Sequence, residues 1–417
     1  MSDQLEGAPA MAPNDLILSD PGTYVDAVPH EFFAHLRSTS PVSWREEPDV
    51  IPYWAVTSYD ACVRVNREWE EYSSSAMTSL PFDVPEEEIV QQQLMMLNMD
   101  PPLHTRYRRL VNKGFTPRMV RDLEARLHTV TDELIDHVIE KGEADFVVDI
   151  AAELPLIVIA ELMGVPFEDR HKMFDWSNKM IGSQDPEYNV TPEVAAEAAM
   201  ELYSYASQLF ASKRSNPHQD LMSVLTQVEV ENESLSDLEL ELFFLLLAVA
   251  GNETTRNLIA GAMNTFFQNP DQWVRLREDR SLMDTAVEEM LRYVTPVMNF
   301  RRTAMTDVTL EGAQIKTGDK VLFFHISANR DEKIFENPDV FDVGRNPNPH
   351  MAFGGGGPHF CLGANLARME IKVMFEHLLD RMPDMTQTGP TQRLRSPFIS
   401  GIKHLPVSFT PGPKVAS

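Results

Sequence analysis

The chain is organised around one short stretch, Phe353-Gly354-Gly355-Gly356-Gly357-Pro358-His359-Phe360-Cys361-Leu362-Gly363. Four successive glycines are costly to order, because glycine loses more backbone freedom on folding than any other residue. Such a loop is expected where the backbone passes close to a flat, bulky group and turns its N–H groups toward the cysteine sulfur. From Ala364 onward the sequence is helical, so Cys361 lies just before a helix N-terminus, where the helix dipole lowers the pKa of a thiol. The stretch therefore predicts a thiolate that binds a metal.

The order of phenylalanine, glycine-rich loop, histidine, cysteine, glycine and helix resembles the haem-binding loop of the cytochromes P450, the haem-thiolate monooxygenases. The loop has one residue more between Phe353 and Cys361 than the commonest form, which resembles actinobacterial-type enzymes that act on sterols and branched lipids. The resemblance implies that Cys361 ligates the iron of haem b and that Phe353, His359 and Gly363 help to bind the cofactor. The alternative is a buried structural cysteine beside a flexible linker; the surrounding motif favours the ligand.

Composition excludes several classes of protein. Apolar residues make up 43% of the 417 residues, enough for a large core, and the net charge of −27 argues against nucleic acid as a partner. Two cysteines are too few for a disulfide framework and indicate a reducing compartment. The acidic, polar N-terminus is unlike a signal peptide. The longest apolar run, Phe243 to Gly251, is shorter than the membrane span of about 20 residues. We therefore expect a cytoplasmic protein without a membrane span.

A basic helix face follows Asp100-Pro101-Pro102. His104 and Arg108 are four residues apart and share that face, which suits the binding of a carboxylate. By resemblance to the P450 family, these two residues bind a haem propionate and Arg302 supplies a second contact. The alternative is an ordinary solvated basic face; the His-x-x-x-Arg pattern after the two prolines favours the propionate site.

A second stretch, Ser236 to Gln268, predicts one long helix. Ser236 and Glu239 form a capping box at its start, and Asn269-Pro270 ends it. Because the helix is apolar nearly all round, it is expected to run buried through the middle of the molecule.

The centre of this helix, Val249-Ala250-Gly251-Asn252-Glu253-Thr254-Thr255, contains polar residues that are out of place in a buried helix. Threonine hydroxyls there can bond to the carbonyl one turn back and loosen the helix, making room for ligand and water. The segment resembles the oxygen-activating segment of the P450 family. By that resemblance Thr254 holds the distal hydrogen-bond network, Glu253 relays protons, and Ala250 and Gly251 make room over the iron. The alternative is a helix kink with a satisfied buried acid.

Further family positions follow in the C-terminal half. Glu289 and Arg292 are spaced for a helical ion pair, which by resemblance joins Arg345 in a structural triad that anchors the loop leading to the haem. Val297 is expected beside the substrate, and Val297, Met298 and Ala250 are candidates for a narrow approach to the iron.

The whole chain predicts a mainly α protein with small β-sheets (α+β). Residues 1–20 are expected to form a flexible lead-in and residues 21–417 a single domain, by resemblance the triangular haem domain of the P450 fold. Apolar spacing predicts helices over Arg118 to Lys141, Leu154 to Leu162, Arg170 to Ile181, Thr191 to Lys213 and Asp220 to Val228. Alternation predicts strands over Val42 to Trp44, Tyr53 to Val56, residues 307 to 325, and a final pair at Ile402 to Phe409. Cys62 is expected to fill the core.

Residues 72–96 are expected to be an irregular loop, and in the resembled family this region covers the substrate pocket. The apolar wall that it would supply consists of Met77, Leu80, Phe82, Val84, Met95 and Met96.

The source of electrons is expected to be external. No strand-helix-strand series appears, so a Rossmann nucleotide-binding domain is not encoded. Electrons from NAD(P)H are expected to arrive through a ferredoxin and a ferredoxin reductase, and the protein is expected to be a monomer. An acidic ferredoxin would be steered to a basic face around Cys361, formed by Arg108, Arg109, Lys113, Arg118, Arg368 and Lys372.

The substrate class is suggested by resemblance within the family. Four stretches look like the steroid C26/C27 side-chain monooxygenases: residues 96–100, 114–118, 248–257 and 345–350. Four residues of the haem loop look more like the methyl-branched lipid ω-hydroxylases: Gly356, Pro358, Phe360 and Leu362. The predicted reaction is hydroxylation of the terminal methyl of a sterol side chain, as in cholest-4-en-3-one. The alternatives are ω-hydroxylation of methyl-branched fatty acids or terpenoids, a peroxide-driven haem-thiolate enzyme, and a haem-binding sensor without turnover. The pair Glu253 and Thr254 argues against the last two.

Overall fold

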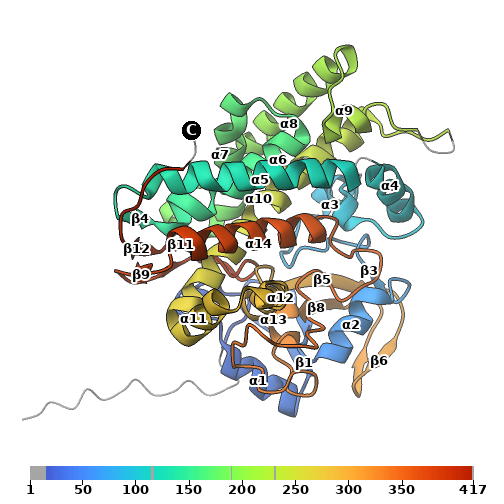
Figure 1. Cartoon of the computed structure of the whole chain (residues 1–417). Helices are drawn as coiled ribbons and strands as arrows, with labels where there is room; N and C mark the ends of the chain where they lie inside the picture. Colours follow the sequence, from blue (N-terminus) through green and yellow to red (C-terminus); the bar gives the residue numbers. More distant parts are fainter. Residues whose placement is uncertain (1–15, 114–116, 189, 230–231, 416–417) are drawn as a thin grey trace, which may run out of the picture.

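The computed structural model describes residues 16–113, 117–188, 190–229 and 232–415 (Figure 1). It confirms a mainly helical chain, and the helices expected from apolar spacing lie within a few residues of their predicted bounds. The helices are α1 His30–Thr39, α2 Tyr59–Arg67, α3 Glu86–Gln92, α4 Leu103–Asn112, α5 Pro117–Val138, α6 Glu153–Met163, α7 Arg170–Ile181, α8 Pro192–Ser215, α9 Leu221–Leu225, α10 Asp237–Gln268, α11 Pro270–Glu278, α12 Met283–Val294, α13 His325–Ala328 and α14 Ala364–Arg381. None of these helices, over the residues described, combines the length and apolarity needed to cross a membrane.

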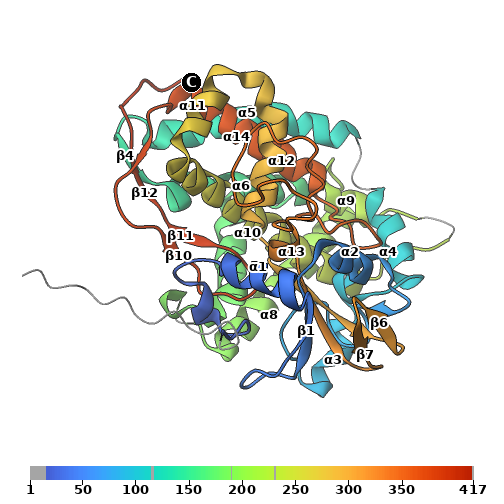
Figure 2. The same cartoon turned by 90° about the horizontal axis from the view of Figure 1, so that it is seen from below.

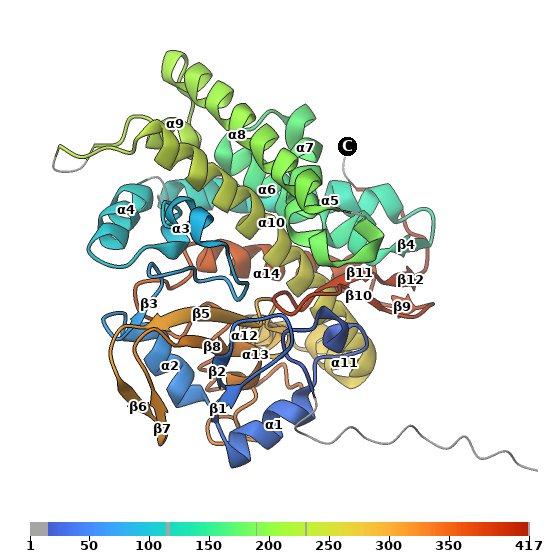
Figure 3. The same cartoon turned by 180° about the vertical axis from the view of Figure 1, so that it is seen from behind.

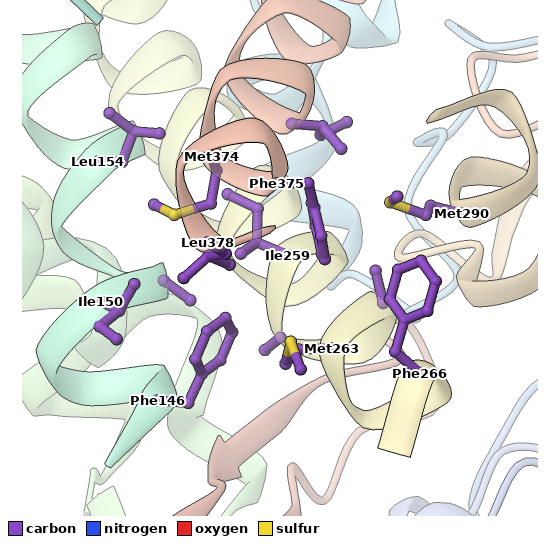
Figure 4. Packing of buried hydrophobic residues seen from close by; sticks show 14 of the residues in the cluster. Phe146, Ile150, Leu154, Ile259, Met263, Phe266, Met290, Met374, Phe375 and Leu378 are labelled. Carbon is purple, nitrogen blue, oxygen red and sulfur yellow. The ribbon is translucent and has the colours of Figure 1, made fainter. Parts of the chain in front are cut away.

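The largest core lies where α10 passes between α6, α12 and α14. Figure 4 shows its centre, where Ile259 and Met263 of α10 meet Met374 and Leu378 of α14. Phe146, from a short π-helix over Phe146–Ala151 that the sequence did not predict, closes one side. All five side chains are at most 1% exposed, so α10 is held as the buried axis that the sequence predicts. Its capping box at Ser236 and Glu239 is present.

A mixed sheet forms the opposite side of the molecule, away from α7, α8 and α9 (Figure 3). Its strand order is β1-β2-β8-β5-β3; β2 and β8 are parallel, with Tyr53 opposite Lys320, and the other neighbours are antiparallel. Seen from below, α1 and α2 lie at this sheet (Figure 2), and both contact its strands. The strands are β1 Val42–Arg45, β2 Tyr53–Val56, β3 Tyr72–Ser73, β4 Glu143–Asp145, β5 Asn299–Ala304, β6 Val308–Leu310, β7 Ala313–Ile315, β8 Lys320–Phe324, β9 Thr386–Gln387, β10 Gln392–Arg393, β11 Ile402–His404 and β12 Pro406–Ser408.

The last two strands do not pair with each other. The sequence predicts a strand pair at Ile402 to Phe409, but β11 pairs with β10, and β12 pairs with both β4 and β9. A single residue, Leu405, separates β11 from β12, which is too short a connection for a hairpin. The C-terminal segment therefore joins two small sheets.

Two segments are more ordered than the sequence predicts. Residues 72–96 include the helix α3, whose three leading glutamates complement the positive end of the helix dipole. Residues 16–20 belong to the expected lead-in, yet Leu18 is 2% exposed and its N–H donates to Glu47 Oε1 at 3.0 Å; residues 1–15 lie outside the described residues. Cys62 is fully buried in the core, as predicted.

Candidate active site

Cys361 lies at the end of the glycine-rich loop, two residues before Gly363, the N-cap of α14. The Gly363 N–H donates a hydrogen bond to the Cys361 sulfur, and the Cys361 N–H donates to the carbonyl of Phe353 at 3.0 Å. The sulfur faces a cavity with largely apolar walls. Desolvation by these walls raises the pKa of the thiol, although Gly363, Arg108 and Arg368 act to lower it. The lowered pKa predicted from the helix dipole is therefore absent here, because desolvation has the larger effect.

The glycines of the loop are required by contact with α2. All four residues from 354 to 357 have positive φ, between +27° and +98°. A Cβ on Gly356 would lie 2.8 Å from Nε of Arg67, and one on Gly357 would lie 2.8 Å from the carbonyl oxygen of Asn66. Asn66 and Arg67 also donate to three loop carbonyls at 2.7–2.8 Å. These contacts hold the loop against α2. The sequence did not identify Asn66 as a partner of the loop.

A cavity of about 260 Å³ is bounded by Cys361 and by one face each of α10 and α14. The lining residues recur every three or four positions, as one face of a helix does. On α10 they are Phe243, Leu246, Leu247, Ala250, Gly251, Thr254, Thr255 and Leu258. On α14 and its N-cap they are Gly363, Leu366, Ala367 and Glu370. Phe353 also lines the cavity, and Arg368 lies over its ring, 4.6 Å from the centroid.

The predicted carboxylate-binding residues meet on one side of this cavity. His104 and Arg108 of α4, Arg302 of β5 and His359 of the loop all line it. The rings of His104 and His359 are 4.3 Å apart, and His359 Nε2 is 3.1 Å from Ser74 Oγ. Burial lowers the pKa of His104 to about 4 and the pKa of Arg302 to about 10. Burial also lowers the pKa of His359 well below its usual value. At neutral pH the two histidines are therefore neutral hydrogen-bonding groups beside charged arginines.

Within the described part of the chain, one buried group on this side lacks a counter-charge and another lacks hydrogen-bond partners. The guanidinium of Arg302 is 3% exposed and donates only to the Arg301 carbonyl and to Asn66 Oδ1, with no ion pair. His325, which begins α13, is 1% exposed, and neither ring nitrogen has a hydrogen-bond partner. Burial lowers the pKa of His325 to about 3, with Arg302 adding to the effect. Unpaired buried donors are costly, so this side of the cavity is suited to an anionic ligand. The sequence did not identify His325.

The centre of α10 shows one predicted interaction and one packing contact that the sequence did not predict. Thr254 Oγ donates to the carbonyl of Ala250 at 2.8 Å, as predicted for a threonine that bonds one turn back. Gly251, predicted to make room over the iron, lines the cavity and also contacts α6. A Cβ there would lie 2.7 Å from Cδ1 of Ile159 on α6, so the glycine lets α6 pack against α10.

Glu253 is turned away from the cavity. Its carboxylate is 1% exposed, pairs with Arg256, and accepts a long hydrogen bond of 3.5 Å from Ser177 of α7. Arg256 in turn donates to Asn178 at 3.1 Å. Burial raises the pKa of Glu253, while Arg256 acts to lower it. Of the two predicted proton-handling residues, Thr254 lines the cavity. Glu253 is not among the residues that line it in the described part of the chain.

Glu289, Arg292 and Arg345 meet, as the sequence predicts. Arg292 donates to both carboxylate oxygens of Glu289 at 2.7 and 2.8 Å, and Arg345 Nε lies 3.1 Å from Oε2. Asn348 also donates to Glu289, and the two arginines bind backbone carbonyls of the segment that precedes the glycine-rich loop. The cluster therefore joins α12 to that segment.

Val297 and Met298 point in opposite directions. Val297 lines the cavity and forms an isolated bridge with Ile399. Met298 is fully buried in a different cluster with Tyr24 and Phe33. Because side chains alternate along an extended segment, only one of two neighbours can face the cavity. The prediction that Met298 narrows the approach to the cavity is wrong.

The predicted basic face also carries acids. Arg368 pairs with Glu288 at 2.6 Å and Lys372 with Asp284 at 2.7 Å. Arg109 lies 3.5 Å from Glu233, and the side chain of Arg118 lies outside the described residues. Arg108 faces the cavity, which leaves Lys113 as the exposed base of the predicted set at the surface hollow beside α4.

A comparison with protein families decides what this site belongs to. The cytochrome P450 family model matches residues 21–387. The chain belongs to the cytochrome P450 family. It is a monooxygenase, and the interpretation as a haem-binding sensor is not supported.

This P450 is similar to several proteins named for lipid oxidation. It is 41% identical to the steroid C26-monooxygenase of Rhodococcus jostii, over 95% of this chain and 85% of that protein. It is 42% identical to the steroid C26-monooxygenase of Mycobacterium tuberculosis, over 94% of this chain and 92% of that protein. The methyl-branched lipid omega-hydroxylase of the same organism is 40% identical, over 91% and 90% of the two chains.

Solved structures share the fold. A P450 of Mycobacterium marinum in complex with pseudoionone has a TM-score of 0.88 and 36% identity, covering 96% of this chain and all of that one. A P450 of Bacillus megaterium in complex with testosterone has a TM-score of 0.80 and 35% identity, covering 92% and 99%.

The family implies haem as the cofactor, and the residues present fit it. Haem is a flat macrocycle with two carboxylates and an iron that accepts a thiolate. The carboxylates would provide the missing counter-charge for Arg302 and acceptors for a ring N–H of His325. The sulfur of Cys361 faces the same cavity.

Proposed function

We propose that this P450 hydroxylates the terminal methyl of a branched sterol side chain, with a 3-keto sterol such as cholest-4-en-3-one as the substrate class. The observation that carries this proposal is the chemistry of the cavity wall contributed by α6, the N-terminal half of α10, residues 96–97 and residues 296–297. That part of the described lining contains no charged side chain: Met96, Leu97, Ile159, Leu162, Phe243, Leu246, Leu247, Ala250, Gly251, Pro296 and Val297. The similarity to steroid C26-monooxygenases supports the same class.

The absence of charge in this wall favours a sterol over a fatty acid. A buried carboxylate needs a cation or several hydrogen bonds to offset its desolvation. The basic groups that line the described cavity lie on α4, β5, α13 and the glycine-rich loop, where the haem carboxylates would take them. A sterol body, with a single keto or hydroxyl group, needs no such partner.

The cofactor would be held by residues already described. Cys361 would ligate the iron, and Arg108, Arg302, His104, His325 and His359 would hold the two carboxylates. Haem bound in this way activates O₂ so that one oxygen atom enters a C–H bond. The protein itself aims the substrate, excludes water and supplies protons.

The proton-handling residues would act from α10. The Thr254 hydroxyl, held on the Ala250 carbonyl, lines the cavity and can pass on a hydrogen bond. Glu253 would supply protons to it, which requires its carboxylate to leave Arg256 and turn toward the cavity.

Val297 would define where the substrate is attacked. A terminal C–H bond is stronger than its internal neighbours, so attack there needs a passage that hides the weaker bonds. Val297 is β-branched, and its bridge to Ile399 fixes the backbone, which makes it a stiff side wall.

Electrons would come from NAD(P)H through a ferredoxin and a ferredoxin reductase in the cytoplasm, with the P450 acting as a monomer. Exposed Lys113 would contribute to a docking site, whereas Arg368 and Lys372 are already paired with acids. Long-range steering by the remaining charge should therefore be modest, and the reduction rate should fall only a few-fold as salt shortens the Debye length to about 8 Å. Stopped-flow reduction at several salt concentrations measures this.

The substrate proposal is tested by titrating the protein with cholest-4-en-3-one and with a methyl-branched fatty acid. The sterol should displace water from the iron, shift the Soret band and be hydroxylated in a reconstituted electron-transfer system. If only the fatty acid does so, the substrate is a methyl-branched lipid, the second candidate that the 40%-identical omega-hydroxylase favours. If neither compound binds and a small terpenoid does, both assignments are wrong.

The site assignments are tested by two variants. Cys361→Ala should lose the absorption that reduced, carbon monoxide-bound thiolate haem gives; an unchanged spectrum would reject Cys361 as the ligand. Thr254→Ala should keep haem and substrate binding but form less product per NAD(P)H consumed, because only proton delivery is removed. Unchanged coupling would reject that role.

A further inference from the structure

Asn66, near the end of α2, bonds to two distant parts of the site at once. Its Oδ1 accepts a hydrogen bond of 3.3 Å from the guanidinium of Arg302. Its amide NH₂ group donates to the carbonyls of Gly354 and Gly356 at 2.8 and 2.7 Å. Asn66 is 4% exposed and lines the cavity. One buried amide therefore joins the strand that carries Arg302 to the loop that carries Cys361.

Packing fixes the position of α2 and hence of Asn66. Cys62 and Val65 of this helix are fully buried in one apolar cluster with Met351, which precedes the glycine-rich loop, and with residues of β8. The strand β8 in turn pairs with β5. Because close-packed side chains resist displacement, α2, β5 and the start of the loop form one packed unit around Asn66.

Arg302 depends on Asn66 for its orientation. The guanidinium is 3% exposed and lies over the ring of Phe323, 5.1 Å from the centroid. Among the described residues, it donates to the Asn66 side chain and otherwise only to the carbonyl of Arg301. A planar guanidinium binds a carboxylate best in a fixed orientation. The bond to Asn66 therefore prepares Arg302 to bind an anionic group in the cavity.

Arg67, the next residue of α2, has a simpler role. Its Nε donates to the carbonyl of Gly355 at 2.8 Å, so it also holds the glycine-rich loop. Arg67 is exposed, and no hydrogen bond joins it to Arg302 in the described part of the chain. The two neighbours give a matched comparison, because both hold the loop and only Asn66 also holds Arg302.

We propose that Asn66 is a positioning residue for haem, one that couples the guanidinium of Arg302 to the loop that presents the Cys361 sulfur. Because a single amide makes all three bonds, a displacement of Arg302 is passed to Gly354 and Gly356, and a displacement of the loop is passed back. A haem carboxylate held by Arg302 would in this way steady the thiolate ligand. The inference rests on the proposed function, since it takes Cys361 as the iron ligand and Arg302 as a partner of a haem carboxylate.

The coupling is tested first by the rate at which the oxidised, substrate-free holoenzyme loses haem to excess apomyoglobin. Asn66→Ala leaves the Arg302 guanidinium and two loop carbonyls without this partner, so the rate should rise about tenfold. The matched control Arg67→Gln should stay within about twofold of wild type. Equal rates for Asn66→Ala and Arg67→Gln would overturn the proposal, since holding the loop would then explain the whole effect.

A second variant separates charge from packing. Asn66→Asp keeps the shape of the side chain and gives Arg302 a buried counter-charge, but its carboxylate cannot donate to the loop carbonyls. Because this carboxylate competes with a haem carboxylate for Arg302, haem loss should be faster than in Asn66→Ala. A residue that only fills space would give the opposite order, with the isosteric aspartate as the milder change, and that order would reject the coupling.

The thiolate ligand supplies a spectroscopic signature. Reduced, carbon monoxide-bound Asn66→Ala should lose the absorption of thiolate haem about tenfold faster than wild type, although Cys361 itself is unchanged. Arg302→Gln should accelerate the same decay from the other side of the coupling. The double variant should fall short of the product of the two single effects, because each residue acts partly through the other. Effects that multiply would show two independent residues and would contradict the proposal.

These outcomes are distinct from a failure of the proposed function. If the wild type lacks the thiolate absorption, or if Arg302→Gln holds haem as well as the wild type does, the roles assigned to Cys361 and Arg302 fail and the inference fails with them. If the wild type shows the absorption and Arg302→Gln loses haem faster, but Asn66→Ala behaves as wild type, only the coupling is wrong. Thermal unfolding of each holoenzyme variant checks that it is folded.

Discussion

Two buried glutamates in this P450 have an arginine three residues further along the same helix, and their surroundings differ. Glu289 of α12 is fully buried and accepts hydrogen bonds from Arg292, Arg345, Asn348 and the Asp342 N–H. Each carboxylate oxygen accepts hydrogen bonds from several donors. The cluster links α12 to the segment before the glycine-rich loop, and none of its members lines the described cavity.

Glu253 of α10 has the same spacing and fewer partners. Arg256 is the one cation paired with it among the described residues, and the bonds from Ser177 and Asn252 are long, at 3.5 and 3.4 Å. Burial raises the pKa of Glu253 because these partners do not replace the lost hydration. The comparison teaches that the number of donors around a buried carboxylate, and not the Glu-x-x-Arg spacing, separates a structural ion pair from one that can change its protonation state.

The largest loss of stability should come from breaking the hydrogen-bonded cluster around Glu289. Glu289→Gln leaves Arg292 and Arg345 buried without a counter-charge, so the free energy of unfolding should fall by about 3–5 kcal/mol. Denaturant unfolding measures this loss. The control is Glu376→Gln at a partly exposed position of α14, whose free energy of unfolding should change little. A loss below about 1 kcal/mol would contradict the structural role of the cluster.

A smaller loss of stability is expected for Glu253→Gln, with a larger effect on turnover. Arg256 keeps its hydrogen bond to Asn178 and its position over the ring of Phe174, 5.6 Å from the centroid. The free energy of unfolding should fall by roughly 1–3 kcal/mol, and product per NAD(P)H should fall about tenfold. Equal losses of stability in Glu253→Gln and Glu289→Gln would remove the distinction between the two sites.

A packing change on α10 separates helix position from acid chemistry. Gly251→Ala places a methyl group against Ile159 and should lower the free energy of unfolding by roughly 1–2 kcal/mol, since overpacking exceeds the gain in helix propensity. Adding Ile159→Val removes the nearest carbon and should recover part of this loss. A Gly251→Ala protein more stable than wild type would show that the α6–α10 contact is not tight.

The smallest effect is expected for an ion cluster at the surface. His404 lies 2.6 Å from Asp145 and 2.8 Å from Glu187. Burial lowers the pKa of His404, but the two carboxylates outweigh it and the net pKa is raised. Its stabilisation is therefore complete below the unfolded pKa of about 6.5 and is lost as pH rises through the folded pKa. From pH 6 upward, the free energy of unfolding should fall slightly more steeply with pH for wild type than for His404→Gln. The same pH dependence in both proteins would reject the effect.

The sequence predicts this site well where the residues are local. Cys361 and its loop, the four-residue spacing of His104 and Arg108, and the caps of α10 all depend on neighbouring positions, and each lies where its pattern predicts. The position of Glu370 in the cavity lining could also have been predicted from the sequence, because it lies seven residues from Gly363 on the same helix face.

Other features depend on contacts between distant segments. Asn66 touches the glycine-rich loop across about 290 residues. His325 directly follows β8, which pairs with β5, the strand that carries Arg302. Gly251 has a packing role that cannot be known before α6 is placed against α10. Met298 was misassigned although strand alternation already separates it from Val297.

The position of the new hydroxyl group tests the central claim most directly. Cholest-4-en-3-one should be incubated with the protein, NAD(P)H and a ferredoxin system, and the product examined by mass spectrometry and NMR. The apolar wall and the stiff contact at Val297 predict one added oxygen at a terminal methyl of the side chain. Oxygen on the ring system or at an internal side-chain carbon would contradict this account of the cavity.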